Sequence, residues 1–424
     1  MMVDRTKAPE LKVPEAITIK APLKWTLKNG VPLFFIPTPG IAAIRCDVSM
    51  PINFQPFDDH HTLIPFFTLN MLLEGIKGKK SGQLDDFFDY YASEVEVLGG
   101  FENHGLSLLS TKKQFKKVLP VFRALFTEAT LPSKELIKRK AQKKLGISLQ
   151  REQVSGRANQ LVRKVLFGND HPLGYIATEE HVEGIAADDI RAYYDKHFRI
   201  KPEIFVTGDL DDKELLAIET AFGDLPYEEN EPYESEYESL GDKRLEEPRP
   251  QAMQESIRLA TITIPKSHPD YFPLWVFNTV YGGYFGSRLV KNIREDKGYT
   301  YGIHSFLNGL AKSDYWMVMA DVKKGFAKEV VEECYKELQH LSFTPLDDEE
   351  LEIVRNYMTG HFLSEFSSPF ELIGKFKKVH QQGLNFDFYN AQLQYIKSFD
   401  PEEVSEVGGK YLKREDIKEV IVGS

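Results

Sequence analysis

The stretch "DIRAYYDKHFRIKPEIFVTGDL", residues 189–210, contains a helix-like segment, then a β-rich run, and then a glycine. The last residues of the chain, "EVSEVGGKYLKREDIKEVIVGS" (403–424), repeat this order about half a chain length later. Similarity between two long segments is the sequence signature of a repeated structural unit. The sequence therefore predicts an internal duplication, with two domains of the same kind.

The clearest break between the two units is the acidic stretch "PYEENEPYESEYESLGDKRLEEPRP", residues 226–250. Glutamates crowd this stretch and prolines flank it, a composition that repels itself and is typical of an exposed linker. An acidic docking strip for a basic peptide is the alternative interpretation. We therefore predict an N-terminal domain over residues 1–225, a linker over 226–250 and a C-terminal domain over 251–424.

Both halves mix the hydrophobic periods of strands and helices. The runs "VPLFFI" (31–36) and "IRLATITI" (257–264) are typical of strands. Helical spacing occurs in "SGQLDDFFDYYAS" (81–93), "KKVLPVFRALFTEA" (116–129), "FAKEVVEECYKELQHL" (326–341) and "SPFELIGKFKKVHQQG" (368–383). Because helices come in groups rather than alternating strictly with strands, we expect an α+β fold: two homologous domains, each a mainly antiparallel sheet packed with helices.

The composition is that of a globular chain of 424 residues, since 42% hydrophobic residues can fill substantial cores. A net charge of −11 argues against a nucleic-acid partner, because such binding needs a clustered basic surface. Basic peptides are more plausible ligands than DNA. The two cysteines, Cys46 and Cys334, cannot form a disulfide framework, and we expect both to be buried thiols.

The N-terminal residues "MMVDRTKAPELKVPEAITIK" carry charges and prolines but no continuous apolar segment. A secretion signal or a membrane anchor would need one. We therefore expect a cytoplasmic protein with no membrane partner, or a periplasmic protein if a signal peptide has already been removed.

The most informative segment is "FNTVYGGYFGSRLVKNIREDKGYTYGIHSF", residues 277–306. It predicts a helix that stops at Gly298 and a strand in which Tyr299, Tyr301 and Ile303 share one face. A double glycine, Ser-Arg-Leu, Ile-Arg-Glu and a tyrosine seven residues after that arginine follow one another here. With this pattern the chain resembles the M16 zinc peptidases, the family of pitrilysin and the mitochondrial processing peptidase, and in particular its shorter bacterial members.

The resemblance covers nearly the whole chain. The stretches "LKNGVPLFFIP" (27–37), "LFGNDHPLGYIATEEHVEGI" (166–185) and "IFVTGDLDDKELLAIETAFGDLP" (204–226) are similar to family segments in the same order. Family members also duplicate one α+β unit, as the two chain halves suggest here.

The metal motif of the active family members is absent from this sequence. Active subunits carry His-x-x-Glu-His on a helix that leads into Met-Leu-x-x-Gly. Aligning that ending on residues 71–75 puts Phe66, Leu69 and Asn70 at the three functional positions. Phenyl and leucine side chains cannot bind zinc, and a lone asparagine is a poor ligand. The further glutamate ligand of the family would fall near Gly146, and Glu152 follows it too late.

The paired histidines His60 and His61 precede this helix by several residues, and nothing in the sequence supplies a third ligand. We expect them to lie in an exposed loop. Thr62 as a cap, Pro65 in the first turn and Gly75 as a stop predict that the helix itself is a packed structural element. We therefore expect no metal in this chain.

Arg294 and Tyr301 match the arginine and tyrosine with which the family binds the scissile region of a peptide. Taken alone, both residues fit structural roles at a helix end and in a strand. The resemblance implies a chain that is not a peptidase by itself but a substrate-binding subunit of a heterodimeric zinc metallopeptidase.

In that assembly a partner M16 subunit would carry His-x-x-Glu-His and the zinc, and the substrates would be extended peptides. A structural scaffold, like the core subunits of the respiratory bc1 complex, and a peptide-binding holdase without proteolysis are the alternatives.

Overall fold

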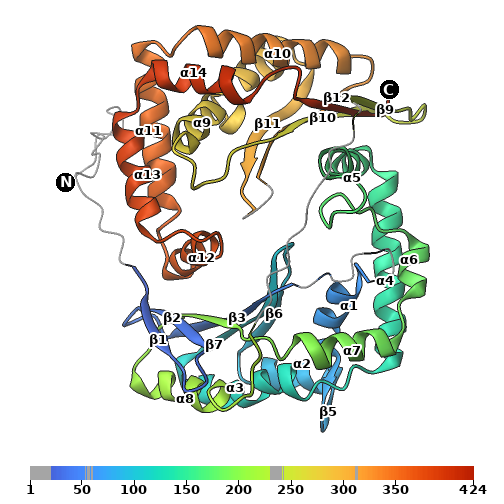
Figure 1. The fold of residues 1–424 in the computed structure, drawn as a ribbon, viewed down its shortest axis with the longest axis vertical. Helices are drawn as coiled ribbons and strands as arrows, with labels where there is room; N and C mark the ends of the chain where they lie inside the picture. The colour runs from blue at the N-terminus through green and yellow to red at the C-terminus, as the bar shows by residue number, and fades with distance from the viewer. Residues whose placement is uncertain are drawn as a thin grey trace, which may run out of the picture.

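Two β-sheets face each other in the computed structural model, which describes residues 21–52, 54, 58, 61–229, 241, 243–310 and 314–424 (Figure 1). The first sheet has the strand order β1-β2-β8-β3-β7-β6. Its strands are β1 (Leu23–Thr26), β2 (Pro32–Pro37), β3 (Ala43–Pro51), β6 (Glu94–Leu98), β7 (Asn103–Thr111) and β8 (Glu203–Gly208).

The second sheet has the strand order β11-β12-β10-β13-β9. Its strands are β9 (Arg244–Glu247), β10 (Gln254–Ile262), β11 (Thr300–Asn308), β12 (Tyr315–Lys323) and β13 (Lys418–Val422). Each sheet contains one parallel pair of strands, β2 with β8 in the first sheet and β9 with β13 in the second. All other pairs in the two sheets are antiparallel. Apart from the additional edge strand β1, the two halves repeat one topology, as the echo between residues 189–210 and 403–424 predicts.

The helices repeat in the same order. The first half contains α1 (Ile64–Met71), the 3-10 turn η1 (Leu72–Glu74), a short hairpin of β4 (Gly75–Ile76) and β5 (Lys79–Lys80), α2 (Ser81–Tyr90), α3 (Lys112–Thr127), α4 (Ser133–Glu152), α5 (Val154–Phe167), α6 (Glu179–Gly184), α7 (Ala187–His197) and α8 (Asp212–Phe222). The second half contains α9 (Tyr271–Asn278), the π-helical segments η2 (Thr279–Gly283) and η3 (Val290–Asp296), α10 (Ala327–Phe343), α11 (Asp348–Ser364), α12 (Pro369–His380), α13 (Asp387–Ser398) and α14 (Pro401–Tyr411). The predicted α+β class is confirmed, and the six quoted segments form the predicted strands β2 and β10 and helices α2, α3, α10 and α12.

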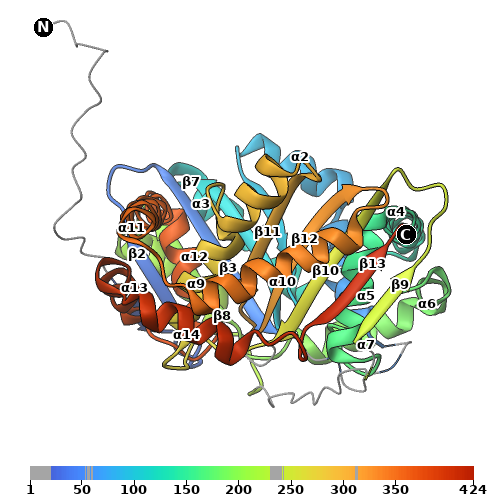
Figure 2. The same cartoon turned by 90° about the horizontal axis from the view of Figure 1, so that it is seen from above.

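Each half lends one helix to the sheet of the other half. Helix α5 packs on β10 and β13 of the second sheet, where Ala158 and Val162 meet Ala260 and Val420 in one apolar cluster. Helix α12 packs on β2 and β8 of the first sheet. Figure 1 shows both helices in the space between the sheets, whereas Figure 2 shows α10 and α14 crossing the outer side of the second sheet. Exchange of helices therefore ties the two halves together across the middle of the molecule.

The acidic stretch predicted as a linker is only partly described. Residues 230–240 and 242 lie outside the described residues. Within the predicted linker, Arg244–Glu247 form β9, which joins the second sheet as the partner of β13. None of the described helices has the length and apolar content required to cross a membrane.

Candidate functional site

Helix α1 holds the positions at which the sequence predicts a degenerate metal motif. Leu69 is buried in the core of the first half, and Phe66 is 41% exposed. The Asn70 amide donates to the carbonyl of Phe66 at 2.8 Å, one turn back in the same helix. None of these three side chains presents a lone pair that is suited to zinc.

A lysine from another helix lies against this position. The Nζ atom of Lys143, on α4, lies 4.1 Å from the centre of the Phe66 ring in a cation–π contact. Burial lowers the pKa of Lys143. Gly146 and Glu152 also lie on α4, and Glu152 is its last residue. An aromatic ring and an ammonium group do not fit a zinc ion, because the ammonium would repel the metal's charge.

The other candidate ligands do not complete a metal site either. His61 pairs with Asp58 through Nδ1 at 2.8 Å, while His60 lies outside the described residues. Within the described ranges, no group of three His, Cys, Asp or Glu side chains is arranged to hold a metal ion. The thiols of Cys46 and Cys334 are buried as predicted, and burial raises the pKa of each.

The ends of α1 differ in one detail from the prediction. Thr62 does not cap the helix, because its hydroxyl donates to the carbonyl of Asp58 at 2.6 Å. The helix begins at Ile64 after Leu63, with Pro65 in its first turn as predicted. Gly75 follows η1 with φ of +151°, a conformation that favours glycine.

Arg294 lies in η3, a π-helical segment just before the edge strand β11. The backbone N–H of Lys297 donates to the carbonyl of Asn292 at 3.1 Å, and Gly298 ends the segment with φ of +62°. The guanidinium of Arg294 lies 4.4 Å from the centre of the Phe285 ring, which is 68% exposed. Isolated π-turns are frequent at functional sites, and this one presents a cation and an aromatic ring together at the surface.

Tyr301 is 93% exposed because of a β-bulge at the start of β11. The pairing of β11 with β12 shifts between Thr300 and Ile303. The Thr300 hydroxyl fixes the shift: it donates to the Asp321 carbonyl at 2.6 Å and accepts from the Gly302 N–H at 3.1 Å. The prediction that Tyr301 and Ile303 share one face is therefore wrong. Ile303 is buried in the core and Tyr301 projects into solvent.

The predicted site residues fall into two separate groups. Arg294 lies in η3 and Tyr301 lies near the start of β11, two elements of the second half that pack against each other. Phe66, Leu69 and Asn70 lie on α1 in the first half. None of the five lines the large pocket between the halves.

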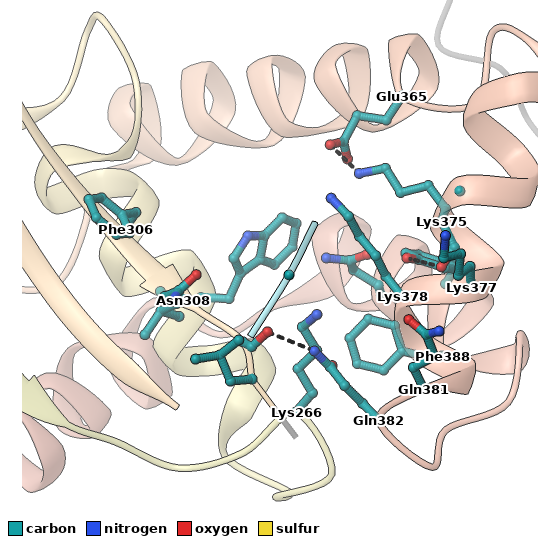
Figure 3. A pocket seen from close by; sticks show the side chains of 18 of the residues that line it. Lys266, Phe306, Asn308, Glu365, Lys375, Lys377, Lys378, Gln381, Gln382 and Phe388 are labelled. Atoms are coloured by element: carbon teal, nitrogen blue, oxygen red, sulfur yellow. Dashed lines mark hydrogen bonds and ion pairs between the residues drawn. The ribbon is translucent and has the colours of Figure 1, made fainter. Parts of the chain in front are cut away.

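That pocket has a volume of about 870 Å³. The first half contributes side chains of β3 and the turn between β6 and β7, and the second half contributes α9, the end of β11, α11, α12 and α13. Figure 3 shows α12 and the segment around Lys266 meeting at this cavity. Aromatic side chains, among them Trp275 and Phe388, alternate with charged ones along the lining.

The basic side chains of this lining differ in their partners. Lys375 pairs with Glu365, and Lys377 reaches across to Asp47 of β3 at 3.2 Å. Lys266 and Lys378 have no hydrogen bond or ion pair within the part of the chain that the structure describes. These lysines were not predicted as site residues, although the run "KFKK" (375–378) on a predicted helix was a visible signal.

Comparison with known proteins agrees with this geometry. A family model described as "Peptidase M16 inactive domain" matches residues 184–358, from α6 through the second sheet into α11. The uncharacterized zinc protease YmxG of Bacillus subtilis is 23% identical over 357 residues, covering 81% of this chain and 84% of that protein. Over residues 184–358 this chain is therefore similar to the peptidase M16 family.

Solved structures of other proteins repeat the fold of this chain. A Pseudomonas fluorescens structure described as a peptidase M16 inactive domain has a TM-score of 0.84 at 19% identity, covering 95% of this chain and 98% of that one. A protease from Helicobacter pylori has a TM-score of 0.83 at 14% identity, covering 96% of this chain and 100% of that one. The periplasmic protease PqqL of Escherichia coli matches all of this chain with 47% of its own length, at a TM-score of 0.78 and 13% identity. At such identities the likeness is one of fold alone.

Proposed function

We propose that this chain is the non-catalytic, substrate-binding subunit of a two-chain zinc metallopeptidase that acts on extended peptides. The observation that carries the proposal is the contact of Lys143 with Phe66, which fills the motif position with a cation and a hydrocarbon ring. The zinc would then be bound by a partner M16 chain with an intact His-x-x-Glu-His. The length of the Escherichia coli relative supports this division, since a unit of this size makes up less than half of it.

Arg294 and Tyr301 are the groups that this chain would offer to a peptide at the partner's zinc. A guanidinium can form two parallel hydrogen bonds to carbonyl oxygens, and a phenol can donate to an oxyanion that develops during peptide cleavage. Tyr301 is almost fully exposed, so packing in the core does not explain a tyrosine at this position. The Phe285 ring contacts the Arg294 guanidinium on one side. Arginine and tyrosine are also enriched where a partner surface is contacted.

A peptide-binding protein without proteolysis is the second candidate, and the pocket between the halves favours it. A cavity of about 870 Å³ that is lined by aromatic and charged groups has the size of a ligand site. A pure scaffold would need neither this cavity nor an exposed tyrosine and an arginine on neighbouring elements.

The test is peptide cleavage by this chain reconstituted with an M16 chain from the same genome that carries His-x-x-Glu-His. We expect cleavage only by the pair, and a loss of about 100-fold in kcat for Tyr301→Phe if its hydroxyl stabilises the transition state. Arg294→Ala should lower kcat/KM and raise KM if the guanidinium holds the ground-state peptide. Tyr90→Phe is the matched control, because Tyr90 is an exposed tyrosine of the first half.

Size-exclusion chromatography of each variant separates a catalytic loss from a loss of assembly. If the pair cleaves at the same rate with both variants, Arg294 and Tyr301 have no part in the reaction and a scaffold is the better description. Cleavage by this chain alone would contradict the proposal outright.

A further inference from the structure

The pocket between the halves has the opposite charge to the chain as a whole. The chain carries a net charge of −11. In the pocket lining, however, the basic residues Arg45, Lys266, Lys375, Lys377 and Lys378 outnumber the acidic residues Asp47, Glu102 and Glu365. The overall charge favours basic peptides, whereas a ligand bound in the pocket interacts most strongly with the charges that line it.

Two of these lysines are already neutralised by the protein itself. Glu365 pairs with Lys375 on the α11 side, and Asp47 pairs with Lys377 on the floor formed by β3. Lys378 lies on the same helix, α12, and has no such acidic neighbour in the described structure. The pairing therefore leaves an uncompensated positive charge at one end of the pocket.

Lys266 is the second lysine of the lining that has no ion pair or hydrogen bond among the described residues, and it is half-buried. Gly309 makes room for its stem, because a Cβ atom there would lie 2.8 Å from the Lys266 Cε. Burial lowers the pKa of Lys266, the Asp314 carboxyl group opposes this shift, and the charges of Lys378 and Lys375 add to it. Burial raises the pKa of Asp314, a carboxyl group that acts on Lys266, to about 7, so that this group is only partly ionised at neutral pH.

We propose that this pocket binds carboxylate groups of an extended peptide, with the ammonium groups of Lys266 and Lys378 as the anchoring cations. Figure 3 shows both side chains directed into the cavity, on the side where Gln382 donates to the Gly309 carbonyl at 2.8 Å. The Gln382 Oε1 atom is buried and has no hydrogen-bond partner among the described residues. Trp275 and Phe388 supply apolar contact beside the two charges.

This inference rests on the proposed function, because it takes the bound peptide to be the substrate. It specifies the substrate class as peptides rich in glutamate and aspartate. It needs no partner and no zinc, so it can be tested on the full chain alone. Lys266 is half-buried and forms no ion pair with its acidic neighbour Asp314, so a ligand carboxylate would stabilise its positive charge. The same positive charge disfavours a lysine-rich peptide in the site.

The experiment is calorimetric titration of the chain with short peptides that differ only at alternate positions, which hold glutamate, glutamine or lysine, and whose ends are blocked. We expect the glutamate peptide to bind at least about tenfold more tightly than the glutamine peptide, and salt to weaken it. The double variant Lys266→Gln, Lys378→Gln should lose about tenfold or more in affinity for the glutamate peptide. Lys328→Gln, on the exposed outer side of α10, should bind like the parent.

A glutamine peptide with a free C-terminal carboxylate distinguishes the two sources of the carboxylate. Tight binding that is lost on amidation would assign the pocket to the end of the peptide rather than to its side chains. Equal binding of all peptides, or an unchanged affinity of the double variant, would overturn the inference. Neither result would touch cleavage by the reconstituted pair, whose failure would overturn the proposed function while leaving carboxylate binding intact.

Discussion

The two sheets bury opposite charges at equivalent places. Gly208 ends β8 and Gly423 follows β13, with φ of +134° and +110°. Relative to these glycines, Asp47 of β3 and Arg258 of β10 occupy the same register, opposite the third residue before each glycine. Both side chains are buried. One topology has therefore accommodated an anion in one half and a cation in the other.

The difference lies in how each buried charge meets the helix from the other half. Lys377 of α12 forms an ion pair with Asp47, which also accepts from Arg45 and Ser107. Burial would raise the pKa of Asp47, but these partners outweigh burial and the pKa lies below its usual value.

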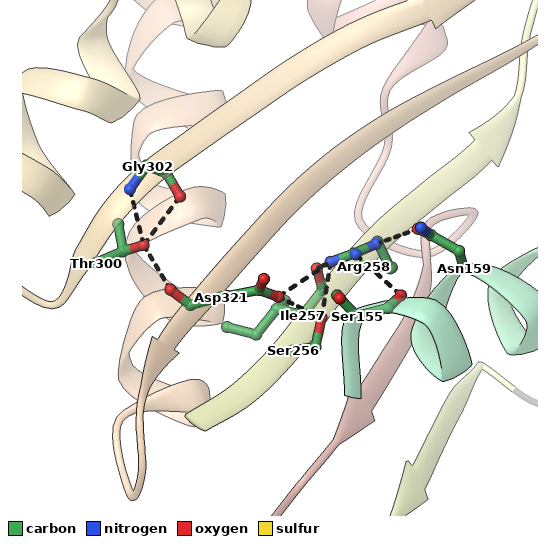
Figure 4. A network of polar contacts seen from close by, with 8 residues as sticks. All are labelled: Ser155, Asn159, Ser256, Ile257, Arg258, Thr300, Gly302 and Asp321. Carbon is green, nitrogen blue, oxygen red and sulfur yellow. Dashed lines mark hydrogen bonds and ion pairs between the residues drawn. The ribbon is translucent and has the colours of Figure 1, made fainter. Parts of the chain in front are cut away.

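Arg258 instead meets the neutral oxygens of α5. It donates to Asn159 Oδ1 at 2.7 Å and to the Ser155 carbonyl at 3.3 Å, as Figure 4 shows. It also donates to Ser256 Oγ at 3.0 Å and to the Ile257 carbonyl at 2.7 Å. The carboxylate of Asp321 lies at 3.9 Å. Hydrogen bonds to neutral groups thus hold α5 on the second sheet, whereas an ion pair holds α12 on the first sheet.

The largest expected effect is that of Arg258→Met. The change leaves several buried oxygens without a donor, and removing one partner from such a buried network typically costs about 3–5 kcal/mol. Urea denaturation should show this loss, and limited proteolysis should cut first near α5. Arg414→Met, which breaks an exposed pair with Glu332, is the control and should cost less than about 1 kcal/mol. A similar loss for both variants would mean that the buried network is not what fixes α5.

Asp47→Asn should cost less, about 2–3 kcal/mol, because the amide keeps the shape of the side chain and can still accept hydrogen bonds. The ammonium of Lys377 would then be left buried without a counter-charge. A double-mutant cycle with Lys377→Met measures the pair directly, with an expected coupling of about 1–3 kcal/mol. A coupling near zero would show that packing of α12, and not its charge, holds the first half.

Acid should weaken the first half more than the second. Burial lowers the pKa of His104 to about 3 and those of His171 and His197 to about 4, whereas the buried residues described in the second half include no histidine. Below pH 6.5 these histidines become protonated in the unfolded chain, whereas in the folded chain they stay neutral. The free energy of unfolding therefore falls as the pH falls towards 4.

The effect should be about 1 kcal/mol for each histidine between pH 6.5 and 5.5. Urea denaturation at the two pH values measures it, and His104→Phe should remove roughly a third of the histidine contribution to the slope. An unchanged slope in that variant would contradict the assignment to His104.

The architecture could be predicted from the sequence because hydrophobic periodicity is a local property of the chain. The spacing of apolar residues in 81–93 and 368–383 predicts amphipathic helices, and the similarity between 189–210 and 403–424 predicts the repeat. Which sheet a helix covers is not local, so nothing in residues 154–167 indicated that α5 packs on the second sheet. For the same reason the bulge at Thr300 and the contact of Lys143 with Phe66 were not foreseen, since each depends on residues that are distant in sequence.

The smallest expected effect on stability is that of Lys143→Met, about 0.5–1 kcal/mol, because a cation–π contact is lost while the stem still packs. The same residue has a larger effect on metal binding. Introducing a histidine pair with Phe66→His and Asn70→His places two imidazoles one turn apart on α1.

With Lys143 present, its ammonium should hold zinc affinity at least about tenfold below that of the same pair combined with Lys143→Met. Calorimetric titration with zinc at neutral pH compares the two variants. Combining the histidine pair with Lys328→Met, at an exposed position, controls for a simple change of net charge. Equal affinities would show that Lys143 moves aside, and that only the lost ligands of α1 separate this chain from a metal-binding relative.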